Sequence, residues 1–270
     1  MIKILGVATC YNRCAKTVNS LNRLRKGNPT VEFHFLIMDD NSTDGTRETL
    51  KKMENVTVLE GNGSLFYSGG MRIAIDWAQK CEEEYDYCLL FNDDVEFYPN
   101  SIEMLAQKNN SMVWVGPTCD ESGQLTYGGI VKNSKYRPSV RVVRAEDKSG
   151  MRCDTFNANC VLIPWRIFCE MENIDEAYIH AMGDFDIGFN LARRGHEIRV
   201  SDEYVGICNT NSVLGTWLDV TLSRRERIKR KKSPKGLPNK LWFHYLKKEY
   251  NLATAVLYSL TPYVRILIKK

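Results

Sequence analysis

Four short apolar runs in the first 98 residues each end in polar, acidic or glycine residues, and this alternation constrains the fold of the chain. The runs cover residues 2–9, 31–38, 56–59 and 87–91. Segments with helical spacing of apolar residues separate them. Runs of this length that end at polar residues are typical of strands buried on both faces of a parallel sheet. The pattern predicts an α/β fold, with a Rossmann-like, mostly parallel central sheet and helices on both faces.

The composition sets broad limits on the class of protein and its location. The chain is 43% hydrophobic and 26% charged, as in an ordinary globular protein with a substantial core. Its nine cysteines show no CxxC pair and no zinc-ligand spacing, so we expect neither a disulfide framework nor a zinc site. No basic stretch followed by a long apolar core opens the sequence, so we expect no secretory signal. These features favour a reducing, cytoplasmic location.

Two pairs of adjacent acids follow predicted strands. Asp39-Asp40 ends the second apolar run, and Asp93-Asp94 follows the fourth. Right-handed crossovers would bring both pairs to one edge of the sheet, where open α/β sheets bind ligands. Asp40 could accept a hydrogen bond from a uracil or thymine ring, and Asp93 could bind ribose hydroxyls. Asp94 is the candidate ligand for Mg²⁺, which binds one or two protein carboxylates together with phosphate oxygens.

The alternative for either acid pair is a structural one, because acids at strand ends also cap turns and helices. For a single pair the two interpretations are equally good. Two pairs in matching positions favour a ligand site.

A glycine-bearing loop at residues 62–72 leads into a helix that we expect to cover residues 71–81. Free backbone N–H groups at a helix start favour a phosphate, so Gly70 and Arg72 are candidate contacts. The loop matches neither a Walker motif nor GxGxxG, and a plain connecting loop is the alternative. Arg13, beside the first strand end, is ambiguous in the same way because surface arginines are usually solvated.

Four motifs in this order resemble family 2 glycosyltransferases over roughly the first 210 residues. The resemblance implies a GT-A fold, an inverting mechanism and a nucleotide-sugar donor with Mg²⁺ or Mn²⁺. The motifs are Val7-Ala8-Thr9-Cys10-Tyr11-Asn12-Arg13, Asp39-Asp40-Asn41-Ser42-Thr43-Asp44-Gly45-Thr46, Asn92-Asp93-Asp94-Val95, and Gly183-Asp184-Phe185-Asp186 with Arg193-Arg194-Gly195.

The resemblance also implies roles for individual residues. Thr9 and Asp40 would contact the nucleobase region, Asp93 and Asp94 would form the metal and ribose motif, and Asp184 would be the catalytic base. The complete set of candidates for binding the donor nucleotide is Thr9, Tyr11, Arg13, Asp40, Gly70, Arg72 and Asp93.

The chain departs from the family pattern at two positions. Gly183 stands where the family commonly has an acid, and Asn92-Asp93-Asp94 replaces the usual Asp-x-Asp. The first departure leaves Asp184 and Asp186 as alternative bases. We favour Asp184, because Arg193 or Arg194 could hold Asp186 as a structural pair.

Two further side chains are candidates for contact with an acceptor or a diphosphate. His180 precedes Asp184 by four residues, and a satisfied structural histidine is the alternative. Asn159, just before a predicted strand at residues 160–163, could face the sugar, and a turn or strand-edge role is the alternative.

The predicted function is transfer of a hexosyl or deoxyhexosyl group from a UDP- or dTDP-sugar to a hydroxyl of a glycan or lipid-linked acceptor. Assembly of cell-surface polysaccharide is the expected context. A sugar-phosphate nucleotidyltransferase is one alternative, although it should carry a Gly-rich loop after the first strand, and residues 9–13 contain no glycine. A non-catalytic, membrane-surface sugar-binding module is the other. Nucleic acid is not an expected partner, because aromatic and basic residues are not interleaved.

The expected organisation is one GT-A domain at residues 1–220 and a basic, amphipathic C-terminal extension at residues 221–270. A nucleotide-binding half of the domain covers residues 1–98, and an acceptor half covers residues 99–220. In the extension, the basic run Arg224 to Lys232 precedes the apolar segment Leu252 to Ile268. This pattern suits the anionic inner face of the cell membrane, and a solvated helix packed on the domain is the alternative. The apolar segment contains Pro262 and is shorter than a span of ~20 residues, so it would lie on a membrane.

Overall fold

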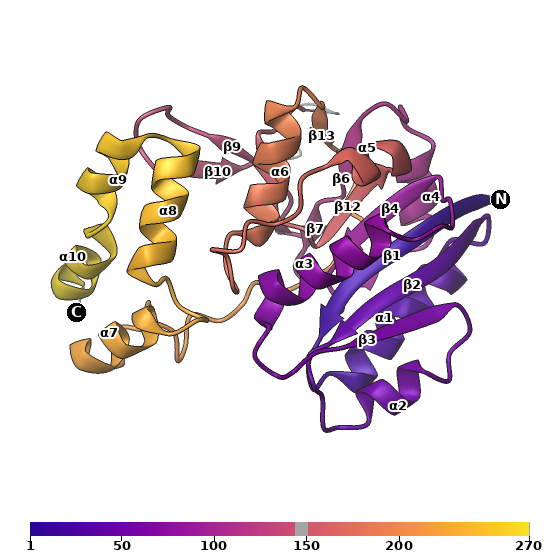
Figure 1. Cartoon of the computed structure of the whole chain (residues 1–270), viewed down its shortest axis with the longest axis horizontal. Coiled ribbons are helices and arrows are strands. Elements are labelled where there is room, and N and C mark those ends of the chain that lie inside the picture. Colours follow the sequence, from indigo (N-terminus) through magenta and orange to yellow (C-terminus); the bar gives the residue numbers. More distant parts are fainter. Residues whose placement is uncertain (144–150, 270) are drawn as a thin grey trace.

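The structure is a computed structural model, and it describes residues 1–143 and 151–269. Within these residues, a seven-stranded central sheet has the order β13-β6-β12-β4-β1-β2-β3 (Figure 1). Every strand runs parallel to its neighbours except β12, which pairs antiparallel with β4 and β6. The bounds are Ile2–Cys10 for β1, Val31–Asp39 for β2, Val56–Glu60 for β3, Tyr87–Phe91 for β4, Val113–Val115 for β6, Cys160–Pro164 for β12 and Ile198–Val200 for β13. The predicted mostly parallel sheet is confirmed.

Helices cover both faces of the sheet, and the alternation along its strands shows why. Leu89 of β4 packs in the hydrophobic cluster with α1, α2 and α4, whereas Leu90 packs in the cluster with α3, α5 and α6 (Figure 1). A strand with apolar side chains on both faces must be covered on both. The helices are α1 Cys14–Gly27, α2 Thr46–Leu50, α3 Phe66–Gln79, α4 Ser101–Ala106, α5 Trp165–Glu170 and α6 Gly183–Arg193.

Two small sheets, built from strands between residues 96 and 207, lie beside the central one. One has the order β10-β9-β11 and the other β5-β14-β7-β8. Residues 144–150, which belong to the predicted acceptor half, lie outside the described residues. The strands are β5 Glu96–Phe97, β7 Thr118–Cys119, β8 Leu125–Tyr127, β9 Gly129–Lys132, β10 Val140–Val142, β11 Thr155–Phe156 and β14 Gly206–Ile207.

The register of the central strands brings both acid pairs to the same edge. Cys10, the last residue of β1, lies opposite Asp39, the last residue of β2. On the other side of β1, Val7 lies opposite Leu90, so the last residue of β4, Phe91, is level with Ala8, near the end of β1. The residues that follow these three strands therefore share the carboxyl edge of the sheet, as predicted.

Helix α3 begins five residues before the predicted start, at Phe66. The expected flexible loop is wrong at this end, because Gly69 and Gly70 belong to the helix. The cap comes from another part of the chain: the Asp40 carboxylate accepts the backbone N–H groups of Leu65 and Phe66, at 3.1 and 3.0 Å. Gly70 lets the helix approach β1, since a Cβ there would lie 2.9 Å from Thr9 Cγ2.

Four helices form the C-terminal part of the chain and lie together at one end of the molecule (Figure 1). Helix α8 packs into the domain, because Leu241, Tyr245 and Leu246 are buried in the same cluster as α6. No helix among the described residues is long and apolar enough to cross a membrane. The bounds are α7 Arg224–Lys232, α8 Asn239–Glu249, α9 Leu252–Tyr258 and α10 Thr261–Ile268.

Candidate active site

An arginine joins the two acids that follow β4. The Arg13 Nη1 atom lies 3.1 Å from Asp93 Oδ1 and 2.9 Å from Asp94 Oδ2. Thr17, one turn along α1 from Arg13, donates its hydroxyl to Asp93 Oδ2 at 2.9 Å. Cys208 donates its thiol to Asp94 Oδ1 at 3.8 Å. The start of α1 thus offsets part of the charge of two adjacent carboxylates that would otherwise repel each other.

Burial makes the two acids different. The Asp93 side chain is 5% exposed, whereas that of Asp94 is 24% exposed. Burial raises the pKa of the Asp93 carboxyl, and the charge of Arg13 partly offsets that effect. Asp94 is therefore the more accessible carboxylate of the pair.

The pair also fits the donor set of a divalent cation. Among the residues that the structure describes, no group of three or more His, Cys, Asp or Glu side chains is placed to hold a metal. Mg²⁺ commonly takes only one or two carboxylates and completes its shell with phosphate oxygens and water. Asp94, with help from Asp93, suits a cation that is shared with a phosphate ligand.

Asp184 is the second residue of α6, and its carboxylate accepts backbone N–H groups. Phe185 N lies 2.9 Å from Asp184 Oδ1, and Ala158 N lies 3.3 Å from Oδ2. Burial raises the pKa of Asp184 to about 6, although these N–H groups and the Asn157 side chain favour the ionised form. The nearby Asp184 charge, added to burial, raises the pKa of the Tyr67 hydroxyl on α3. With a pKa of about 6, the Asp184 carboxylate can accept a proton near neutral pH.

A short segment before β12 connects Asp184 to the acid pair. Ala158 donates to Asp184, while the carbonyl of the next residue, Asn159, accepts from Asn92 N at 3.2 Å. The Asn159 side chain donates to Cys208 Sγ at 3.4 Å, and Cys208 contacts Asp94. Asp93, Asp94 and Asp184 therefore lie around one segment at the carboxyl edge of the sheet.

The surroundings of α6 explain why Asp184, and not a neighbour, is the free acid. A Cβ at Gly183 would lie 2.5 Å from Ser68 Oγ, so this position has no room for the family's usual acid. Asp186 is 2% exposed, and its Oδ1 lies 2.6 Å from Lys248 Nζ on α8. This burial in an ion pair supports a structural role for Asp186, and the choice of Asp184 as the base stays a prediction.

The predicted partners of Asp186 are nevertheless wrong. Arg193 pairs with Glu249 at 2.8 Å, and Arg194 pairs with Glu172 at 2.9 Å. The arginines lie at the end of α6, whereas Asp186 lies in its first turn and meets α8.

Asp40 and the start of α3 use each other's hydrogen-bonding groups. Asp40 accepts from Gly63 N at 2.8 Å in addition to Leu65 and Phe66. These N–H groups, which were candidates for a phosphate, are already paired. An ionised carboxylate has about four acceptor positions, so Asp40 retains capacity for a nucleobase. That contact stays a prediction.

Gly70 and Arg72 have structural roles that need no ligand. Gly70 is buried against Thr9. The Arg72 guanidinium donates to the carbonyls of Ile174, Asp175 and Tyr178, at 3.0, 3.3 and 2.6 Å, and so fixes the segment that leads to α6. Contact of either residue with the donor stays a prediction.

The remaining candidates differ in accessibility. Tyr11 is 51% exposed just beyond β1, where a planar ring could stack on it. His180 has a buried Nδ1 without a partner among the described residues, and burial lowers the pKa of its ring. Asn159 is 4% exposed and bonded to Cys208, a placement that favours its alternative structural role over contact with the sugar.

Sequence reasoning missed Thr17, Tyr67 and Cys208. Thr17 lies four residues after Arg13, so helical spacing could have placed it beside the acid pair. Cys208 follows β14, and pairing of β14 with β5 brings it to the acid pair. The sequence around Cys208 contains no motif that would have predicted this position. Tyr67 was assigned to a loop because the start of α3 was misplaced.

A mostly parallel sheet with an acid pair beyond β4 and a separate carboxylate across the edge has the architecture of the GT-A class. The sequence model described as glycosyl transferase family 2 matches residues 7–152, which is more than half of the chain. The chain belongs to this family, and the resemblance inferred from the four motifs is confirmed.

Solved structures show the same fold at low sequence identity. S. aureus TarS 1–349 is 15% identical, with a TM-score of 0.54, over 99% of this chain and 81% of that chain. Its complex with UDP-GlcNAc gives a TM-score of 0.56, over 98% and 72% of the two chains. The mannosyltransferase PcManGT from Pyrobaculum calidifontis, in complex with GDP-Man and Mn²⁺, is 9% identical with a TM-score of 0.56, over 98% and 73%. No curated protein matches the sequence.

The ion pair between Lys248 and buried Asp186 predicts an effect on stability. In Lys248→Met, buried Asp186 keeps the N–H of Asp175 but loses its cation, and Asp175 also loses its ion pair with Lys248. The free energy of unfolding should fall by roughly 1–3 kcal/mol, the cost of a buried polar atom that loses its partner. Urea unfolding of the variant measures this change. Lys247→Met is the matched control, because Lys247 is exposed and should leave stability within ~0.5 kcal/mol of the parent protein. Equal stability of the two variants would contradict the assignment.

Proposed function

We propose that this family 2 glycosyltransferase moves a sugar, with inversion, from a UDP- or dTDP-sugar to a hydroxyl of a glycan or lipid-linked acceptor. Assembly of cell-surface polysaccharide is the proposed context. The observation that carries the proposal is the link through Ala158 and Asn159. It connects the Asp184 carboxylate to Asn92, the residue that precedes the Asp93–Asp94 pair.

Structural relatives support the proposed class of donor and cation. TarS has been solved with UDP-GlcNAc and with UDP, and PcManGT with GDP-Man and Mn²⁺. A diphosphate and a cation require negative and positive groups side by side, and this chain supplies Asp93, Asp94 and Arg13. We therefore assign residues 1–98 to the donor half and residues 99–220 to the acceptor half.

The donor side of the site manages charge. Asp94 and Asp93 would hold Mg²⁺ or Mn²⁺, which stabilises the negative charge that develops on the departing diphosphate. Arg13 adds a fixed positive charge at the same edge. Thr9, Asp40 and exposed Tyr11 lie around the ends of β1 and β2, where we propose that the nucleobase binds.

The acceptor side needs one base. Asp184 takes the proton of the acceptor hydroxyl as the oxygen attacks the anomeric carbon. A pKa of about 6 leaves the carboxylate mostly ionised at neutral pH, yet basic enough to share a proton. A single displacement with one carboxylate inverts the anomeric centre, whereas retaining glycosidases place two carboxyl groups around the bond.

The metal assignment predicts that Asp94→Ala loses the Mn²⁺-dependent part of UDP binding, because the accessible carboxylate of the pair is gone. Calorimetric titration of UDP and dTDP with and without Mn²⁺ measures it. Glu96→Ala is the control: Glu96 lies two residues further on, is exposed and pairs with Arg23. Undiminished Mn²⁺-dependent binding in Asp94→Ala would contradict the assignment.

The base assignment predicts that Asp184→Asn retains donor binding but loses roughly 10²–10⁴-fold in transfer, the usual contribution of a positioned base. Because only the ionised carboxylate accepts a proton, parent turnover should rise with pH through about 6 and then level off. The residual activity of Asp184→Asn should lack that rise. Nucleotide diphosphate release in a donor and acceptor screen provides the measurement. Normal turnover in Asp184→Asn would overturn the role of Asp184.

A further inference from the structure

Helices α9 and α10 both expose aliphatic side chains, and these exposed residues are named here the C-terminal apolar face. Within each helix they recur at intervals of one, three and four, the spacing that places side chains on one side of a helix. Their exposed fractions run from 49% to 75%. The face consists of Leu252, Val256, Leu257, Leu260, Val264, Leu267 and Ile268.

The opposite side of the same helices is fixed to the rest of the protein. Ala255 and Ile266 are fully buried. The Trp242 indole N–H donates to the Tyr258 carbonyl at 3.1 Å, and buried Arg227 of α7 donates to the Lys269 carbonyl at 2.7 Å. The two helices are therefore oriented, with one apolar side packed on the domain and the other directed at the surroundings.

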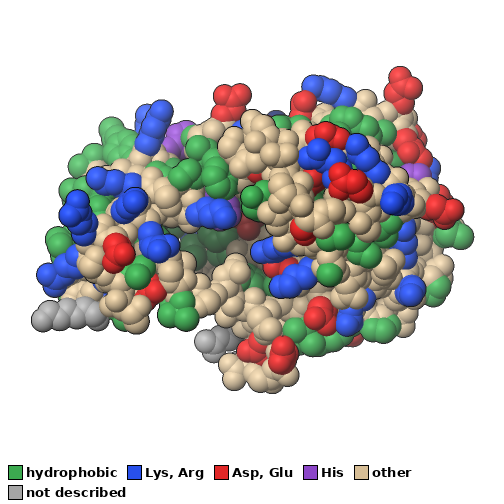
Figure 2. All heavy atoms as spheres, turned by 90° about the horizontal axis from the view of Figure 1, so that it is seen from below, with side chains coloured by type: hydrophobic (Ala, Val, Ile, Leu, Met, Phe, Trp, Pro, Cys, Tyr) green, Lys and Arg blue, Asp and Glu red, His purple; other side chains and the backbone are tan. Residues whose placement is uncertain are grey.

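The charge of the protein is concentrated around this face. Fourteen of the 37 Lys and Arg residues but only two of the 33 acids fall in residues 221–270, so this segment carries +12 and the preceding 220 residues carry −8. Glu249 is buried in ion pairs, and Arg227 and Lys231 are buried cations, so most but not all of this charge lies at the surface. Figure 2 shows Lys and Arg side chains gathered over the C-terminal helices, with hydrophobic side chains beside them.

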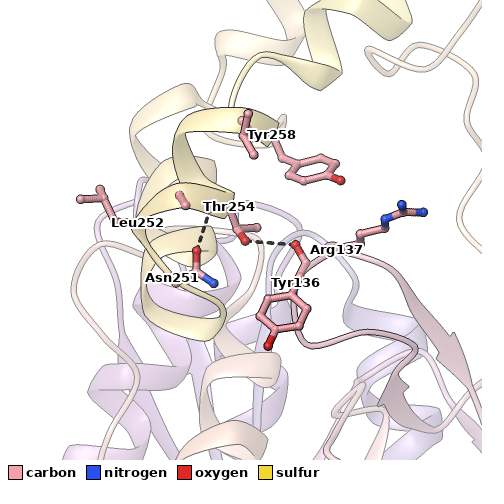
Figure 3. A pocket seen from close by; sticks show the side chains of 8 residues that line it. Tyr136, Arg137, Asn251, Leu252, Thr254 and Tyr258 are labelled. Carbon is pink, nitrogen blue, oxygen red and sulfur yellow. Dashed lines mark hydrogen bonds between the residues drawn. The ribbon is translucent and has the colours of Figure 1, made fainter.

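A hollow of about 660 Å³ opens beside the apolar face (Figure 3). Leu252 and Leu257 belong to both the hollow and the face. On the far side, Tyr136 and Arg137 lie in the loop before β10, and Thr254 Oγ1 donates to the Tyr136 carbonyl at 3.0 Å. The exposed Arg137 adds a cation at the edge of the apolar surface.

We propose that the C-terminal apolar face docks on an anionic lipid bilayer. The aliphatic side chains enter the boundary between headgroups and acyl chains, and the exposed basic side chains of α7, together with Arg137, contact lipid phosphates. An aliphatic row beside a strongly basic helix is the composition of a segment that lies in the membrane interface. A second copy of the chain fits this surface poorly, because a two-fold contact would oppose two segments of charge +12.

This inference rests on the proposed function for its meaning, since a lipid-linked acceptor would be presented at such a surface. It also specifies the membrane location proposed from the sequence, by naming the helices that make contact. Lys248 and Glu249 of α8 hold this end against α6, so docking would orient the helix that carries Asp184 relative to the bilayer.

Vesicle sedimentation of the full chain tests the proposal. We expect binding to vesicles of phosphatidylcholine with phosphatidylglycerol, weaker binding in high salt, and little binding to phosphatidylcholine alone. Leu257→Ser/Leu260→Ser should weaken binding by roughly tenfold or more, because two leucine side chains that would be buried in the bilayer are lost. Arg225→Glu/Lys229→Glu should weaken it by roughly tenfold or more through lost attraction to anionic lipid.

Matched variants carry the same changes elsewhere on the surface. Ile73→Ser/Trp77→Ser replaces exposed apolar residues of α3, and Lys26→Glu/Lys52→Glu reverses exposed charges far from the C-terminal helices. Both should bind anionic vesicles as the parent does. UDP binding with Mn²⁺, measured on the same preparations without vesicles, tests the proposed function separately.

Three results would overturn the proposal. One is absence of binding to anionic vesicles, and another is parent-like binding by the leucine variant. The third is a parent protein that forms a dimer and does not bind vesicles, together with a leucine variant that is monomeric. A second copy of the chain would then cover the face.

Discussion

The site depends on how two adjacent carboxylates are tolerated at the end of a buried strand. Asp93 and Asp94 follow β4, whose five residues are all buried, and one of the two acids is itself almost inaccessible. Arg13 spans both carboxylates, and Thr17 supports the inner one. The start of α1 is thereby tied to the end of β4, across β1. Two carboxylates beside one arginine leave this edge with a net negative charge, which favours a divalent cation, and a bound cation can in turn hold a diphosphate.

Two acids in the first turn of α6 show how surroundings divide the work between similar residues. The Asp184 carboxylate accepts hydrogen bonds from backbone N–H groups, and burial raises its pKa to about 6. Asp186 forms an ion pair with Lys248. Ser68 leaves no room for a side chain at Gly183. Because Lys248 lies on α8, the C-terminal helices help to define which acid is free. The same helices carry the apolar face, so catalysis and docking would share one structural support.

The sequence was sufficient for those features that arise from local periodicity. Apolar runs of four to eight residues and the polar residues after them predicted the sheet, its carboxyl edge and the acids that gather there. The start of α3 could not be predicted, because its cap is Asp40, a residue from the end of β2. The partner of Asp186 could not be predicted either, because Lys248 meets it only when α8 folds back. A glycine in the sequence can indicate either a loop or a helix that packs closely on a strand. At Gly70 the second explanation holds, because a Cβ there would contact Thr9 of β1, and this contact is visible only in the structure.

The most direct measurement is the anomalous scattering of Mn²⁺ in crystals grown with a UDP-sugar. The account predicts a peak at coordination distance from the Asp94 carboxylate, and a diphosphate between that carboxylate and the segment that carries Ala158, with the sugar facing Asp184. Arg13 should then have turned from the acid pair to the phosphates. A peak remote from Asp94, or a sugar bound on the opposite edge of the sheet from Asp184, would contradict it.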